Sequence, residues 1–269
     1  MAMKNRLGGH TNSYHTYSLE EALEGIAAAG FKFVELSSVK GWSEFVPLDA
    51  DGKTLNSIQR MLNKLGLIPI SLSGHSDLTT ADGLKDGKMA IDLCERLGID
   101  IMNTAVGGHS SQHEDEASFM GNVHYLADYA AARDILIGLE IHGELTNTGK
   151  NAVAVLEKIN RPNVLVNYDT ANCEFYGNVK AVDDIATCID KMIHCHLKDK
   201  GAEGRVWNFP AVGKGHVDFK KILAILKKGG YTGPFSVEIE FKGEPWPALK
   251  AVNAAMKQSY KALSELGLA

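Results

Sequence analysis

The chain has 269 residues, of which 45% are hydrophobic and 23% are charged, so it is long enough to bury a sizeable core. Its formal net charge of −5 argues against nucleic acid as a partner, because nucleic-acid binders usually carry a basic face. No apolar run approaches the roughly 20 residues that cross a bilayer, and residues 1–9 lack the apolar core of a signal peptide, so we expect no membrane partner.

The first half of the chain alternates short apolar runs with amphipathic segments. A predicted strand at residues 6–10 precedes Ser18 and Glu21, whose spacing is that of a capping box, so a helix is expected to begin there and to end at Gly30. Strands at 31–36, 68–72 and 101–105 follow in turn, separated by helices at 54–65 and 85–97. A polar loop at 107–116 then leads into a helix that runs to about residue 133.

The second half of the chain repeats this alternation. Strands are predicted at 136–141, 164–168, 192–197 and 235–239, and helices at 151–159, 182–190, 219–228 and 247–266. Residues 164–166 are all apolar, so both faces of this strand are hydrophobic, as a parallel sheet covered by helices requires. Eight strand–helix units in this length predict an α/β fold, a closed (β/α)8 TIM barrel with one domain over residues 1–269. No GxGxxG follows the first strand, so a Rossmann fold loses its main support.

The last four predicted strands each end with an acid or a histidine, and functional residues of such a barrel collect at these ends. Each residue alone has an ordinary explanation, as a loop acid or a hydrogen-bonded core histidine. A closed barrel, however, brings the four residues next to one another. Three buried carboxylates beside an imidazole repel one another unless a cation pairs with them. Oxygen-rich ligation with one nitrogen predicts one divalent ion, with Mn²⁺ expected and Mg²⁺, Co²⁺, Zn²⁺ and Fe²⁺ open as alternatives. The four residues are Glu140, Asp169, His196 and Glu238.

Six further side chains are expected to bind the substrate, and structural pairing is the ordinary alternative for most of them. His142 lies two residues past Glu140, so strand alternation points both the same way. Asn172 and Lys198 follow the sixth and seventh strands, and Arg205 lies in an aromatic-containing loop after the seventh. His75 and Glu35 lie at the ends of the third and second predicted strands.

Several segments resemble the xylose isomerase-like TIM-barrel superfamily, the sugar phosphate isomerase/epimerase group. The matching segments are HxHLKD at 194–199, GxGxxDF at 213–219, and residues 27–36, 139–143, 168–172 and 236–240, so the resemblance covers nearly the whole chain. It implies that Glu140, Asp169, His196 and Glu238 are the metal ligands and that Glu140 and Glu238 are also the catalytic acid and base. Members of the group often carry D-x-x-H after strand six, whereas the fourth position here is Asn172, which cannot carry a proton.

The resemblance implies an isomerase or epimerase of a sugar, keto-sugar or cyclitol. Two carboxylates on opposite faces of a bound sugar can remove a proton α to a carbonyl and return one from the other side. The alternative is a metal-dependent lyase or dehydratase of the same superfamily, similar to inosose dehydratase or to enzymes that cleave 3-keto-glycosides. An abasic-DNA endonuclease and a non-catalytic binding module are less favoured readings.

The partners and location follow from the same considerations. We expect a small sugar-like substrate and no nucleic acid, and the resemblance leaves a homo-oligomer, a dimer or a tetramer, open. The four cysteines form no CxxC pair and no disulfide-like framework, so we expect reduced thiols in a cytoplasmic protein.

Overall fold

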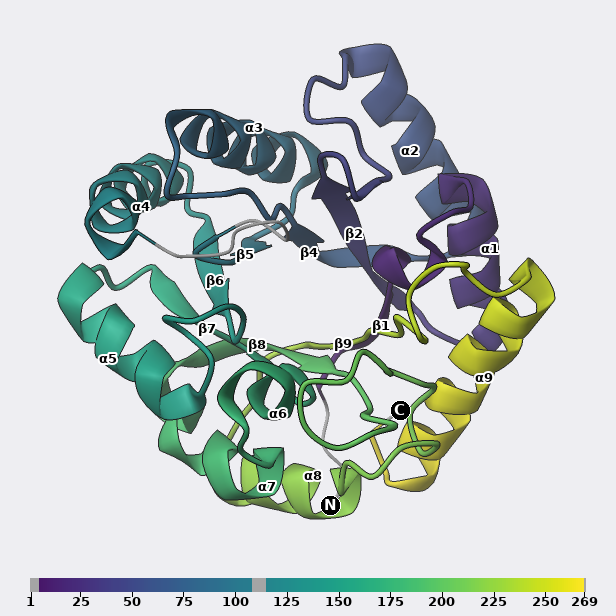
Figure 1. Cartoon of the computed structure of the whole chain (residues 1–269). Helices are drawn as coiled ribbons and strands as arrows, with labels where there is room; N and C mark the ends of the chain where they lie inside the picture. Colours follow the sequence, from purple (N-terminus) through teal and green to yellow (C-terminus); the bar gives the residue numbers. More distant parts are fainter. Residues whose placement is uncertain (1–4, 108–114, 269) are drawn as a thin grey trace.

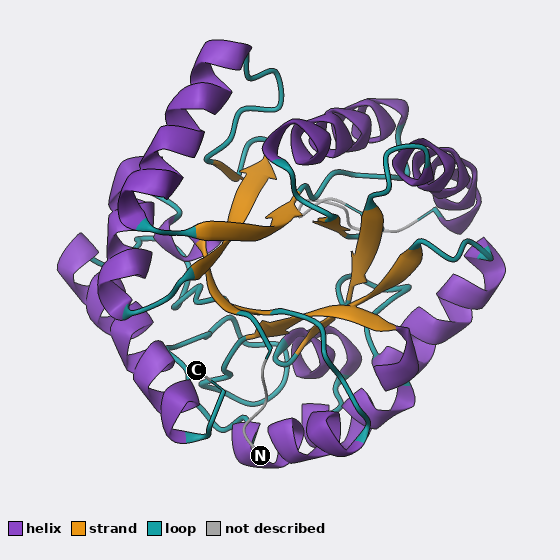
Figure 2. Cartoon of the chain, turned by 180° about the vertical axis from the view of Figure 1, so that it is seen from behind, coloured by secondary structure: helices purple, strands orange, loops and turns teal. Residues whose placement is uncertain are grey.

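Eight parallel strands close into a barrel, and helices surround it (Figures 1 and 2). The computed structural model describes residues 5–107 and 115–268. Strand β1 pairs with both β2 and β9, which closes the sheet and confirms the predicted (β/α)8 barrel. The barrel strands are β1 (Leu7–His10), β2 (Phe33–Val39), β4 (Ile68–Ser73), β5 (Ile101–Thr104), β6 (Leu136–Glu140), β7 (Val164–Asp169), β8 (Met192–Leu197) and β9 (Phe235–Val237).

The longer helices form the outer ring and begin and end where local chemistry favours it. Ser18 and Glu21 form the predicted capping box at the start of α1, and Gly30 ends that helix with a left-handed φ of 113°. Asp51 and Thr80 cap α2 and α3 in the same manner, by accepting a backbone hydrogen bond. The helices are α1 (Leu19–Ala29), α2 (Gly52–Leu65), α3 (Ala81–Leu97), α4 (Glu116–Ala131), α5 (Gly149–Ile159), α8 (Phe219–Lys228) and α9 (Leu249–Glu265).

The barrel interior contains a polar layer beneath its C-terminal mouth. Gly138 in β6 makes room for this layer, because an added Cβ there would lie 2.1 Å from Asn103 Oδ1. Asn103 in turn donates a hydrogen bond to Glu35 Oε1 at 2.7 Å. Both Asn103 and Glu35 are fully buried, so the layer is sealed from solvent.

The predicted helix at 182–190 is wrong as one continuous element. The structure has instead a short α7 (Ala181–Asp184) and two 3-10 turns, η2 (Ile185–Thr187) and η3 (Ile189–Lys191). The Asp184 carboxylate accepts hydrogen bonds from the Gly149 backbone N–H at 2.7 Å and from the Tyr168 hydroxyl at 2.9 Å. The Thr187 hydroxyl donates to the Asp184 backbone carbonyl at 2.7 Å. A side chain that takes a backbone carbonyl competes with helical hydrogen bonding at that position.

Three short elements were not predicted, and each lies near the mouth of the barrel. They are η1 (Thr11–Tyr14), β3 (Ser43–Glu44), which pairs antiparallel with β2, and α6 (Asn172–Gly177). Strand β2 also runs to Val39, three residues beyond its predicted end. Residues 108–114 lie outside the described residues, so the loop predicted at 107–116 is not described.

Two chemical expectations about the whole chain can be compared with the structure. All four cysteines are buried and free, as expected for reduced thiols. Among the described residues, none of the helices has the length and apolar character needed to span a membrane.

Candidate active site

The four predicted metal ligands lie together at the mouth of the barrel. Their ligand atoms are all within 4.8 Å of one another, and all four residues are buried. Glu140, Asp169 and His196 belong to β6, β7 and β8, and Glu238 follows β9 directly. The Nδ1 atom of His196 lies 3.3, 3.9 and 3.6 Å from carboxylate oxygens of Glu140, Asp169 and Glu238.

The donor atoms of this cluster fit one divalent ion. Within the described part of the chain, neither Asp169 Oδ2 nor His196 Nδ1 has a hydrogen-bond partner, although both are buried. Buried polar atoms without a partner are rare, and a bound ion would satisfy both. Three carboxylates and one imidazole suit a hard or borderline divalent cation, so the residues present fit the predicted ion.

The charges of the cluster create a strongly negative field at its centre. Burial raises the pKa of Asp169 to about 7, with Glu140 and Glu238 adding to the rise and Lys198 opposing it. Burial disfavours the charged form of His196, but the surrounding carboxylates outweigh it and hold the pKa of its imidazole well above the usual range. The raised pKa of His196 reflects the negative charge around it, whereas the raised pKa of Asp169 reflects mainly its burial.

Glu140 is fixed by three neighbouring side chains. Asn172 donates to its Oε1 at 3.0 Å, and Asn167 donates to its Oε2 at 3.2 Å. His75 Nε2 lies 3.1 Å from the same Oε2 atom. These contacts hold the carboxylate in one orientation, so it does not need to be ordered when a substrate binds.

Glu238 is fixed in a similar way from the other side. Asn12 donates to its Oε1 at 2.8 Å, and His10 Nδ1 lies 3.1 Å from that oxygen. Lys198 Nζ lies 3.1 Å from Glu238 Oε2 and 2.5 Å from Glu240 Oε2. The ammonium group of Lys198 is therefore shared between two buried carboxylates.

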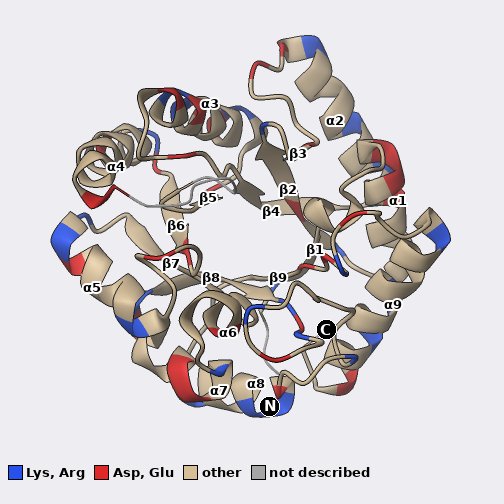
Figure 3. Cartoon of the chain, viewed as in Figure 1, with Lys and Arg blue, Asp and Glu red and all other residues tan. Residues whose placement is uncertain are grey.

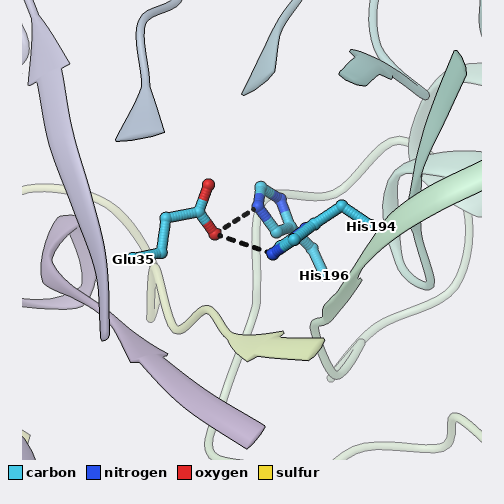
Figure 4. A group of neighbouring side chains, drawn as sticks. All are labelled: Glu35, His194 and His196. Carbon is cyan, nitrogen blue, oxygen red and sulfur yellow. Dashed lines mark hydrogen bonds and ion pairs between the residues drawn. The ribbon is translucent and has the colours of Figure 1, made fainter. Parts of the chain in front are cut away.

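A second acid–histidine group, Glu35, His194 and His196, shares His196 with the metal-ligand cluster (Figure 4). Glu35 Oε2 lies 2.9 Å from His196 Nε2 and 3.6 Å from His194 Nε2. His194 has further partners at both ring nitrogens: Nδ1 lies 3.0 Å from Asn167 Oδ1, and Nε2 lies 3.1 Å from the Ser236 hydroxyl. Burial lowers the pKa of His194 to about 3, so this ring is neutral. The group is a hydrogen-bonded support beneath the cluster.

A cavity opens above the cluster, with an acidic floor and an aromatic rim. The carboxylates of Glu140, Glu238 and Glu240 contribute to its floor. Its rim contains Trp42, Tyr176 and Trp207, which come from the β2–β3 turn, α6 and the loop after β8. Around the outer helices, acidic and basic segments are interspersed (Figure 3), so the gathering of acids at this mouth is a local feature.

Four of the six predicted substrate residues line this cavity: His75, His142, Asn172 and Lys198. The expected substrate contact of Glu35 does not fit its position, because its side chain has 0% exposure and lies in the layer beneath the cluster. Arg205 is exposed and lies outside the described lining, with its guanidinium 5.8 Å from the centre of the Tyr176 ring.

Comparison with known proteins identifies the family. A family model described as the xylose isomerase-like TIM barrel matches residues 23–264. The chain belongs to this family. The superfamily resemblance predicted from the sequence is thereby confirmed.

Two curated relatives of this chain are named as sugar epimerases. The L-ribulose 3-epimerase of Methylomonas sp. (strain DH-1) is 28% identical over 260 residues, which cover 88% of this chain and 86% of that protein. The L-ribulose-5-phosphate 3-epimerase UlaE of Salmonella paratyphi C (strain RKS4594) is 25% identical over 248 residues, which cover 87% and 86%. Among solved structures, the IOLI protein with a binding zinc atom matches at a TM-score of 0.78 and 17% identity over 97% of both chains. The names of the two curated relatives agree with the predicted isomerase or epimerase class and do not favour the lyase alternative.

Several residues that line this cavity were not singled out from the sequence. Glu240 lies two residues past Glu238, so the alternation that indicated His142 could have indicated Glu240 as well. Asn12 follows the first strand, where barrel chemistry is expected. Trp42 gave no signal, because its turn was not predicted as part of the mouth.

Proposed function

We propose that this protein is a divalent-metal-dependent epimerase of a keto-sugar, which inverts a carbon next to the carbonyl. The observation that carries the proposal is the pair of buried carboxylates Glu140 and Glu238, which face His196 Nδ1 from two strands separated by β7 and β8. The curated relatives named above are 3-epimerases of ribulose or its phosphate, which supports the same chemistry. Asp169 and His196 complete the proposed ligand set.

The two glutamates act as base and acid in the proposed mechanism. One carboxylate accepts the proton from the α-carbon, and the electron pair of the broken C–H bond forms the enediolate double bond as the carbonyl oxygen gains charge. The protonated carboxyl group on the other side then gives its proton to the opposite face of the same carbon. The pair finishes with exchanged protonation states, which solvent exchange or the reverse reaction resets. A bound divalent ion supplies Lewis-acid stabilisation of the negative charge on the substrate oxygens.

The neighbouring side chains hold these groups in place. Asn172 and His75 orient Glu140, while Asn12 and His10 orient Glu238. Preformed orientation of reacting groups lowers the barrier, because less ordering is needed at the transition state. His142 and Lys198 line the cavity and are proposed to contact substrate hydroxyls.

The finer assignments are also proposals. We propose Mn²⁺ as the working ion, because the donor set is oxygen-rich with one nitrogen. A cytoplasmic location fits the four free cysteines. One domain over residues 1–269 and a homo-oligomeric state stay predictions.

The test follows proton exchange in deuterated water. The Mn²⁺-loaded protein is incubated with keto-pentoses and keto-hexoses, and NMR follows deuterium at the carbon next to the carbonyl. We expect a deuterated epimer with no loss of water. At Mn²⁺ concentrations that saturate each variant, Glu140→Gln and Glu238→Gln should each lose at least about 100-fold of the rate, the lower range for a lost acid or base.

The matched control is Glu157→Gln, which makes the same chemical change at an exposed site on α5 and should leave the rate unchanged. Full turnover by both active-site variants with normal metal binding would contradict the proposal. Release of water with a new enone absorbance would assign the lyase alternative instead.

A further inference from the structure

The loop after β8 has a sequence that is typical of a phosphate cradle. Gly213, Lys214 and Gly215 precede α8, and β8 is the seventh strand of the barrel. In TIM barrels a phosphate site is frequently built from the loops after strands seven and eight together with a helix N-terminus. Consecutive backbone N–H groups in such a loop form a concave anion site.

In this chain the cradle already contains an anion of its own. The Asp199 carboxylate accepts hydrogen bonds at Oδ2 from the backbone N–H groups of Gly213, Lys214 and Gly215, at 2.8, 3.1 and 2.8 Å. Its Oδ1 accepts from the Val217 N–H at 3.1 Å. Asp199 has 0% exposure, so an incoming phosphate cannot displace solvent there and would have to displace the carboxylate.

Close packing and capping secure this arrangement. A Cβ on Gly215 would lie 2.3 Å from Asp199 Oδ1 and 2.2 Å from the Lys200 carbonyl oxygen, so only glycine allows the approach. The adjacent α8 N-terminus is capped by the Asp218 side chain, which accepts from the Lys221 N–H at 3.0 Å. Both anion-binding features of this region therefore hold carboxylates of the protein itself.

The cavity offers little to a second anion. Three carboxylates line it, and Lys198 is the cation among its described lining residues. The Lys198 ammonium is already paired with Glu238 and Glu240. The nearby Lys200 ammonium donates to the backbone carbonyls of Ala202 and Val206. The proposed divalent ion is enclosed by the carboxylates of its own ligands, so a phosphate dianion would meet the remaining acidic charge with no unpaired lysine or arginine among the described lining residues, which opposes binding.

The rim suits a neutral polyol. The rings of Trp42 and Trp207 lie 6.5 Å apart between their centres, and aromatic faces pack against the C–H groups of a sugar. The indole N–H of Trp207 is buried without a hydrogen-bond partner among the described residues, and a single neutral donor suits a hydroxyl. These observations differ from the charged, multi-donor surroundings that a phosphate requires.

We propose that the substrate is an unphosphorylated ketose, which this protein selects over the corresponding sugar phosphate. The proposal rests on the epimerase function above and decides between the two substrate types that the relatives carry in their names. The occupied Asp199 cradle and the acidic cavity carry it independently of each other.

The experiment compares free ketoses with their phosphate esters, including L-ribulose and L-ribulose 5-phosphate, on the full Mn²⁺-loaded chain. Deuterium exchange at the α-carbon gives kcat/KM for each. We expect the free ketose to be preferred by on the order of 100-fold, as like-charge repulsion predicts. Equal or better exchange with the ester would overturn this inference while leaving the epimerase function intact. Exchange with neither substrate type would sink the epimerase function, and this inference with it.

A variant separates charge from shape. Glu240→Gln removes one negative charge from the cavity wall at nearly constant volume, so it should lower KM for the ester more than for the free ketose. Glu157→Gln is the control, since it changes net charge equally at the exposed face of α5. An unchanged KM ratio in Glu240→Gln would show that cavity charge does not set the preference.

Discussion

Replacement of Glu35 by glutamine should weaken metal binding without unfolding the barrel. Glu35 presents Oε2 to His196 Nε2 at 2.9 Å and Oε1 to the Asn103 amide at 2.7 Å, so both oxygens act as acceptors. A glutamine amide has one acceptor and one donor. If its NH2 faces His196, Nε2 must accept, and the ring proton moves to Nδ1, which blocks the proposed ligand atom. If its NH2 group instead faces the Asn103 amide, two N–H donors point at each other and the hydrogen bond between these side chains is lost.

The expected size of the effect follows from the position of Glu35. Loss of the carboxylate that orients a metal-binding histidine typically costs about 10- to 100-fold in metal affinity. That range corresponds to about 1.4 to 2.8 kcal/mol of binding free energy. Because Glu35 does not reach the cavity, kcat at saturating Mn²⁺ should change far less than the affinity for Mn²⁺.

Isothermal titration calorimetry with Mn²⁺ measures the affinity, and circular dichroism verifies the fold. Ser71→Ala is the matched control, because the Ser71 hydroxyl lies 3.2 Å from His194 Nε2, in the same buried group but on the histidine that is not a proposed ligand. We expect wild-type affinity for that variant. Wild-type affinity in Glu35→Gln as well would refute the reasoning, since His196 would then not depend on Glu35 for its orientation.

Two further predictions concern stability. Chelation of the ion should lower Tm and abolish proton exchange, and Tm should rise again as Mn²⁺ is added, because a ligand that binds only the folded state stabilises it. A Tm that is independent of Mn²⁺ would contradict an ion at the barrel mouth. Gly215→Ala should destabilise the fold by about 1 to 3 kcal/mol in urea unfolding, because its Cβ would crowd Asp199. The matched Gly121→Ala in α4 meets no atom within 4 Å and should be neutral or stabilising, so equal losses in both variants would count against the crowding argument.

The sequence predicted that the four candidate ligands would converge, because strand periodicity and barrel closure leave few alternatives; their role as metal ligands stays a prediction. Glu140, Asp169 and Glu238 lie at or just past strand ends, and a closed parallel barrel brings all such positions to one mouth. Mn²⁺ was expected from the oxygen-rich donor set and stays a prediction, since several divalent cations accept three carboxylates and one imidazole.

Glu35 was misplaced for a physical reason. The second strand was predicted to end at residue 36, but β2 continues through Ser37 and Ser38 to Val39. Their hydroxyls are satisfied by neighbours, with Ser37 Oγ 2.6 Å from Ser43 Oγ and Ser38 Oγ donating to the Val46 carbonyl at 2.5 Å. Glu35 therefore sits one layer deeper than a strand-end residue. Such long-range hydrogen bonds are not visible in the local pattern.

The helix predicted at 182–190 failed for a related reason. Its apolar spacing favoured a helix, but Asp184 is bound to Gly149 and Tyr168, which belong to other elements. Tertiary contacts of one residue thus outweighed the propensity of the segment.

The aromatic rim is built from turns and a short helix, whereas the metal-ligand cluster and its support are built from strands. The Trp42 indole N–H donates to Asn12 Oδ1 at 3.0 Å, so Trp42 supports the side chain that orients Glu238 and is best left in place. Tyr176 and Trp207 have no such link to the two glutamates among the hydrogen bonds described above. Libraries confined to Tyr176 and Trp207 would therefore sample new substrate shapes while the contacts of Glu140 and Glu238 stay as they are. The molecule is for this reason a tractable starting point for changing which sugar is processed while keeping how it is processed.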